Sequence, residues 1–92
     1  MFVLDSHCDT PTMMMRGRDI GIDNERGHVD LPKLKAGGVD ASFFALYTSA
    51  DMTPDASTRH ALEMIGRIYD QIGANPDLAA LAMTPDEALR NK

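Results

Sequence analysis

The residues with the clearest chemical potential lie near the start of the chain, in the stretch DSHCDTP from Asp5 to Pro11. His7 and Asp9 are two positions apart, and imidazole and carboxylate groups are common ligands of divalent cations. In a strand both side chains point to the same side, with Cα atoms about 6.5–7 Å apart. The spacing therefore predicts that both groups converge on one cation, while Cys8 faces the packing layer.

Two ligands do not by themselves define a metal site. A catalytic zinc centre usually takes three protein ligands and a water molecule, and the H-x-D spacing also arises by chance. In the structural alternative, His7 hydrogen-bonds near a turn and Asp9 caps the following segment. The other histidines add little, because His28 lies in a polar loop, where we expect it to be solvated, and His60 lies beside an apolar helical stripe.

Two segments are expected to form the strands that position these groups. Phe2–Asp9 begins with apolar residues and stops at a proline turn. Val39–Thr48 carries mostly apolar residues at both its odd-numbered and its even-numbered positions. This favours a strand buried on both faces of a parallel sheet. Catalytic groups of α/β barrels lie at the carboxyl ends of their strands. Tyr47 is therefore a candidate substrate-binding residue, although a tyrosine on a strand also packs well in a core.

Helices are expected between and after these strands. Residues 12–31 predict an irregular or partly helical connection, followed by one helical turn after Pro32 that ends at a glycine pair. Apolar residues at helical spacing predict a helix from Pro54 to Gly73. Residues 77–84 suit a brief third strand or a docking turn. A last helix begins at Pro85, with Thr84 at its N-cap and a glutamate at capping-box spacing.

The alternation of strands and helices predicts an α/β fold with two or three parallel strands. Such a small sheet has open edges, and a (β/α)8 barrel takes about 250 residues. We therefore expect residues 1–92 to form a single incomplete domain, the N-terminal fragment of a TIM-type barrel.

Composition excludes several classes of function. The 92 residues carry a formal net charge of −5, which argues against nucleic acid as a partner because phosphate binding needs a basic face. No apolar run is long enough to span a bilayer, and no export signal opens the chain. A single cysteine excludes an internal disulfide, and we expect a cytoplasmic location.

Two stretches of the sequence resemble a known family. DSHCDTP and VDLPKLKAGGVDASFFALYTSAD are similar to the first two segments of the membrane dipeptidase (renal dipeptidase) family of metallopeptidases. The resemblance implies an amidohydrolase-type barrel that hydrolyses dipeptides with a hydroxide shared by two zinc ions. His7 and Asp9 match the two ligands that the family's first strand gives to one zinc.

The remaining parts of such a site are expected beyond residue 92. The resemblance implies a bridging glutamate, two later histidines and a general acid/base on later strands, and Glu87 lies in a helix and does not match that glutamate. No catalytic residue is thus assigned within the chain. We expect it to be inactive alone and to bind zinc at most weakly.

Two alternatives stay open. One is another amidohydrolase-type metallohydrolase that acts on a different amide or ester. The other is a small non-catalytic module that self-associates into a homo-oligomer through open strand edges and the apolar stripe of residues 54–73.

Overall fold

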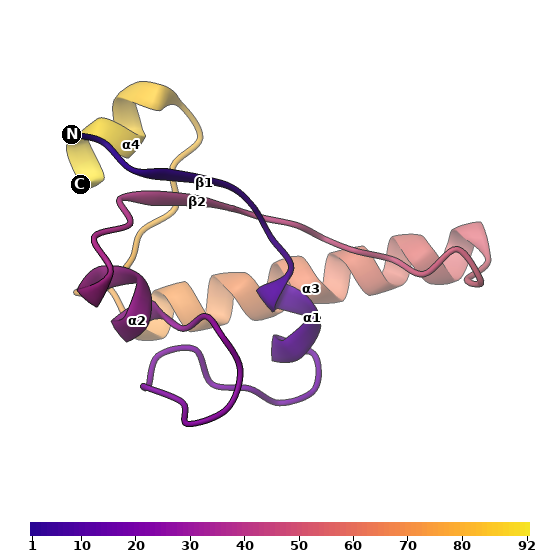
Figure 1. Cartoon of the computed structure of the whole chain (residues 1–92). Coiled ribbons are helices and arrows are strands. Elements are labelled where there is room, and N and C mark those ends of the chain that lie inside the picture. Colours follow the sequence, from indigo (N-terminus) through magenta and orange to yellow (C-terminus); the bar gives the residue numbers. More distant parts are fainter.

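Two short parallel strands form the sheet of the protein. The structure is a computed structural model that describes residues 1–92. Strands β1 (Leu4–Cys8) and β2 (Ala41–Phe44) lie side by side (Figure 1). Both are shorter than the sequence predicts.

Residues 77–84 form no strand, so of the two alternatives for that segment the third strand is wrong. The α/β class with parallel strands is confirmed, and it is compatible with a portion of a (β/α) barrel.

The pairing of the two strands contains a bulge. Asp5 is paired with Ser42 and Cys8 with Phe44, so β1 has one more residue than β2 between these pairs. The additional residue shifts the alternation of side chains along β1. As a result Leu4 is exposed whereas Cys8 is buried. In a regular strand these two residues, four positions apart, would face the same side.

Two short helices lie between the strands. Helix α1 (Thr10–Met14) begins directly after β1, with Pro11 in its first turn, where a missing N–H costs little. Helix α2 (Leu31–Ala36) is capped by Asp30, whose side chain accepts a hydrogen bond from the Lys33 amide at 2.8 Å. The prediction of a partly helical connection followed by one short helix is thus confirmed.

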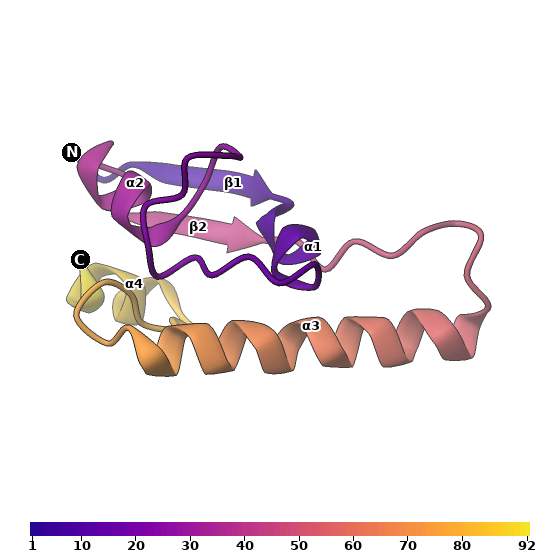
Figure 2. The ribbon, with the colours of Figure 1, turned by 90° about the horizontal axis from the view of Figure 1, so that it is seen from below.

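Helix α3 (Pro54–Ala74) returns alongside the strands as a second layer (Figure 2). Thr53 caps it by accepting a hydrogen bond from Ala56 N at 3.2 Å. Helix α4 (Pro85–Asn91) follows, capped by Thr84. Glu87 accepts a hydrogen bond from the Met83 amide, one residue before the expected partner of a capping box.

The core lies between α1, α2 and the C-terminal half of α3. Met14, Ile20 and Leu31 form a buried cluster. Partly buried apolar side chains pack against it from the other elements: Leu34, Phe44, Ile68, Leu78 and Ala79. The expectation that the second strand is buried on both faces is wrong, because Phe43 is 64% exposed. Only α3 covers the strands as a long helix, and one face of β2 stays open.

The ends of the chain lie close together (Figure 1). Lys92 Nζ donates to the Met1 carbonyl oxygen at 3.1 Å and stands 3.9 Å from an Asp40 carboxylate oxygen. Asp40 in turn accepts a hydrogen bond from Val3 N at 2.8 Å, which anchors the start of β1. None of the helices combines the length and apolar content that crossing a bilayer requires.

Candidate functional site

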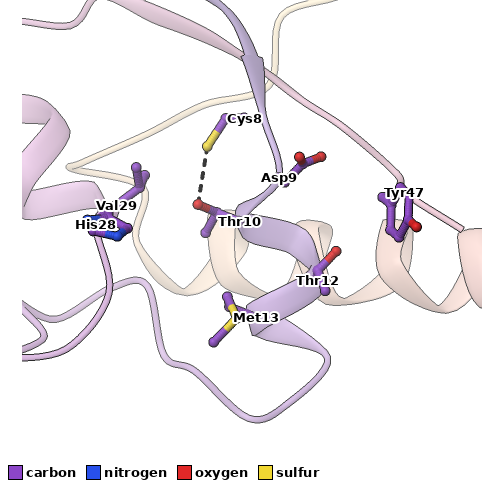
Figure 3. A pocket seen from close by; sticks show the side chains of 8 residues that line it. All are labelled: Cys8, Asp9, Thr10, Thr12, Met13, His28, Val29 and Tyr47. Atoms are coloured by element: carbon purple, nitrogen blue, oxygen red, sulfur yellow. Dashed lines mark hydrogen bonds between the residues drawn. The ribbon is translucent and has the colours of Figure 1, made fainter. Parts of the chain in front are cut away.

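A shallow hollow lies at the carboxyl ends of the two strands. Its volume is about 460 Å³, and it is open to solvent. Eight residues from the end of β1, from α1, from the loop before α2 and from the segment after β2 line it (Figure 3): Cys8, Asp9, Thr10, Thr12, Met13, His28, Val29 and Tyr47. Because the strands are parallel, the segments that follow them meet at the same edge of the sheet.

His7 and Asp9 are brought together at this edge. His7 Nε2 lies 3.1 Å from Asp9 Oδ1, and the two side chains are 68% and 60% exposed. The expectation that both groups point the same way thus agrees with the structure. No backbone hydrogen bond of the sheet restrains Asp9, because β1 ends one residue earlier.

The geometry of this pair suits two neighbouring ligands of one cation. Zinc binds imidazole nitrogen and carboxylate oxygen at about 2.0–2.1 Å, which puts adjacent ligand atoms of a tetrahedron about 3.3 Å apart. The observed separation of 3.1 Å is close to that value. The structure brings no third His, Cys, Asp or Glu side chain to the pair, so these two residues could fill at most half of a four-coordinate shell.

Cys8 and Asp5 support the strand end rather than the hollow's chemistry. Cys8 is buried, as predicted, and its Sγ donates to Thr10 Oγ1 at 3.1 Å (Figure 3). Asp5 accepts hydrogen bonds from Ser42 Oγ at 3.0 Å and from the His7 backbone amide at 3.2 Å. Asp5 therefore ties β2 to the backbone of His7, on which the imidazole direction depends.

Tyr47 lies in the hollow rather than in the core. Its side chain follows β2 by three residues and is 58% exposed. Figure 3 shows it on one side of Asp9 and Thr12, with His28 and Val29 on the other side. Tyr47 was expected at the end of a strand reaching Thr48, but β2 ends at Phe44, and Tyr47 lies at this edge in the segment that follows the strand.

His28 is the lining residue whose position sequence reasoning missed. It is exposed, as expected of a loop residue, yet it lines the same hollow as Asp9. No local pattern marks this, because the loop is placed by contacts with distant residues. The local signal nearest to His28 is Asp30, because an aspartate two residues before Pro32 predicts a helix N-cap. That cap fixes where the loop carrying His28 ends.

Asp30 anchors the loop electrostatically. It is 1% exposed and accepts hydrogen bonds from Asn24 N at 2.9 Å and from Lys33 Nζ at 2.7 Å, besides the amide at the cap. Burial acts to raise the pKa of Asp30, but the Lys33 side chain and the two backbone amides outweigh it and lower the pKa to about 2. Lys33 also pairs with Asp23, and Asp23 and Asp30 together raise the pKa of Lys33.

The fold and the family comparison agree on the kind of protein to which the chain belongs. The two parallel strands with their helices are compatible with a portion of a (β/α) barrel, and His7 and Asp9 lie at the carboxyl end of its first strand. The family model for membrane dipeptidase (peptidase family M19) matches residues 1–92, and the chain belongs to this family. The family is one of peptidases, so the resemblance seen in the two sequence stretches is confirmed.

Proposed function

We propose that the chain is the N-terminal part of a metal-dependent dipeptidase that hydrolyses dipeptides at a two-zinc centre. The observation that carries this proposal is the 3.1 Å approach of His7 Nε2 to Asp9 Oδ1 at the carboxyl end of β1, in a chain matched throughout by a peptidase family.

The residues of this chain have binding roles in the proposal. His7 and Asp9 hold one cation, and neither transfers a proton. Tyr47 lines the wall beside Asp9 and contacts the dipeptide. When bound, the cations supply Lewis-acid polarisation of the scissile carbonyl and activation of water.

The rest of the site is proposed to come from later segments of a longer parent chain. Two ligands leave a first shell half filled, and the 92 residues bring no third ligand to the pair. A two-stranded parallel sheet also leaves two edges that further strands of a barrel can pair with. The 92-residue chain alone is accordingly proposed to be inactive and to bind zinc weakly.

Calorimetric titration of zinc into the 92-residue chain tests this proposal. We expect weak binding that His7→Ala abolishes and that the matched control His60→Ala leaves unchanged, because His60 lies on α3. Binding that is indifferent to His7→Ala would refute the assignment of the ligands. Tight binding lost in His7→Ala would instead mean that association of chains completes the site.

Exposed apolar side chains favour a second candidate, a self-associating module. Phe43, Leu62, Tyr69 and Leu89 are exposed on the strand, α3 and α4, and both strands have an unpaired edge. Sedimentation velocity over a range of concentrations separates the candidates. A stable dimer that persists without zinc and survives His7→Ala favours the module, whereas a monomer favours the dipeptidase portion.

A further inference from the structure

The bulge in β1 contains one of the two proposed metal ligands. Between its paired residues Asp5 and Cys8, β1 has two residues where β2 has one, and His7 is one of them. Bulges redirect the side chains that they carry and are frequent beside functional sites. The direction of the His7 imidazole therefore depends on the bulge and on the contacts that hold the bulge in place.

Both carboxylate oxygens of Asp5 hold this bulge. Asp5 Oδ1 accepts a hydrogen bond from the backbone amide of His7 at 3.2 Å, two residues further along the chain, as in an Asx turn. Asp5 Oδ2 accepts a hydrogen bond from Ser42 Oγ at 3.0 Å. One side chain thus joins the neighbouring strand β2 to the backbone of a proposed metal ligand.

Asp5 reaches His7 through the backbone, from the face of the sheet that the helices cover. Its partner Ser42 is two residues before Phe44, which packs against the buried cluster, and residues two apart in a strand share a face. Asp5 is half-buried, whereas the His7 side chain is 68% exposed. Asp5, His7 and Asp9 do not form a three-residue group that could hold a metal ion. The position of Asp5 therefore suits a support of the His7 backbone rather than a third ligand.

We propose that Asp5, together with Ser42, is a positioning residue that fixes the His7 backbone so that the imidazole points at Asp9. The geometry that it maintains is the 3.1 Å approach of His7 Nε2 to Asp9 Oδ1. The inference rests on the proposed function, because the pair is taken to bind the cation. The conformation of His7 is nevertheless a property of the metal-free chain, and it can be measured without zinc.

A substitution that keeps the hydrogen bonds of Asp5 but removes its charge distinguishes positioning from metal binding. In Asp5→Asn the amide oxygen accepts from His7 N, and the NH₂ group donates to Ser42 Oγ, since a hydroxyl accepts as well as donates. Asp5→Ala removes both contacts. A carboxylate that bound or attracted zinc would be needed for its charge, so both variants would bind zinc poorly. A positioning carboxylate is impaired in Asp5→Ala and rescued in Asp5→Asn.

NMR of the 92-residue chain tests the proposal, first without metal and then during a zinc titration. In the metal-free wild type we expect side-chain couplings that report one χ1 rotamer of His7, and Overhauser effects between its ring and the Asp9 methylene. Asp5→Ala should average these couplings and remove the Overhauser effects. It should also raise the zinc Kd, followed by the His7 ring signals, about fivefold to tenfold, the equivalent of one hydrogen bond. Asp5→Asn should restore the wild-type values, and Ser42→Ala should cause a smaller change in the same direction.

Asp40→Ala is the matched control for a general weakening of the strand. Asp40 also anchors β1, by accepting a hydrogen bond from Val3 N at 2.8 Å, but its contact lies at the start of the strand. This variant should lower the free energy of unfolding in urea and leave the His7 rotamer and the zinc Kd unchanged. Equal loss of the His7 rotamer in Asp40→Ala and Asp5→Ala would mean that Asp5 has only a structural role.

The outcomes separate this inference from the proposed function. An unchanged His7 rotamer in Asp5→Ala overturns the inference, and so does an Asp5→Asn variant that behaves like Asp5→Ala. If Asp5→Ala does not fold, Ser42→Ala decides by the same couplings, and wild-type values in that variant overturn the inference. If zinc binding proves independent of His7, the proposed function fails, and the metal-free couplings still decide whether Asp5 positions His7.

Discussion

Replacing Asp30 by asparagine is predicted to destabilise the protein by about 2 kcal/mol at neutral pH. The carboxylate accepts hydrogen bonds from three donors, and the amide of asparagine turns one acceptor oxygen into an NH₂ group that faces a donor. The pKa of Asp30 is lowered from 3.8 to about 2. At 1.36 kcal/mol per unit, this difference corresponds to about 2 kcal/mol of native-state stabilisation. A buried donor left without a partner costs a similar amount.

The difference in the free energy of unfolding between wild type and Asp30→Asn should depend on pH. The folded-state pKa of Asp30 lies below the unfolded value, so its contribution is complete well above pH 3.8 and is lost as the pH falls toward 2. Urea unfolding followed by circular dichroism should therefore show a difference between wild type and Asp30→Asn that shrinks over this window. Asp51→Asn serves as the control, because Asp51 is exposed in a loop. A difference that is constant from pH 2 to 7, or equal to that of the control, would refute the electrostatic reasoning.

Three further predictions concern backbone conformation and capping. Gly66→Ala should stabilise the chain by roughly 0.5–1 kcal/mol in thermal unfolding, because Gly66 lies within α3 and a Cβ there meets no atom within 4 Å. Gly27→Ala should destabilise the chain by at least about 1 kcal/mol, because Gly27 has φ +86° and the new Cβ would meet Arg18. A stabilising effect would contradict the described conformation of the loop. Thr84→Ala should lower the free energy of unfolding by about 1 kcal/mol, because Thr84 Oγ1 accepts a hydrogen bond from Glu87 N at 3.1 Å. It should speed amide hydrogen exchange in α4 alone. Faster exchange in α3 as well would contradict a local capping role.

The sequence was most informative where structure is set by local interactions. The bounds of α3 follow from the threonine cap, Pro54 and the helical repeat of apolar residues, all of which act within a few positions along the chain. The same is true of α2, which begins between Asp30 and Pro32. His7 and Asp9 approach each other as expected, but Asp9 follows β1 with φ −90° and ψ 13°, so the alternation of a strand does not by itself account for their approach.

The features that sequence reasoning missed depend on contacts between distant segments. The bulge in β1 arises from its register with β2, which lies 37 residues away at the Asp5–Ser42 contact. The exposure of Phe43 depends on which helices cover the sheet, and apolar composition alone does not show this. The place of His28 depends on how the buried Asp30 holds its loop through Asn24 and Lys33. Residue types predict what each group can do chemically, but the neighbours of each group are set by tertiary packing.

The wide separation of the two paired strands has a consequence for how the chain folds. Strand pairing must close a loop of some three dozen residues, which costs about 3 kcal/mol of chain entropy before any ladder hydrogen bond forms. Helix α3, with 21 residues, needs no such closure for its backbone hydrogen bonds, because these join residues four positions apart. The long helix should therefore gain structure on the microsecond scale, and the sheet edge that carries His7 should assemble late.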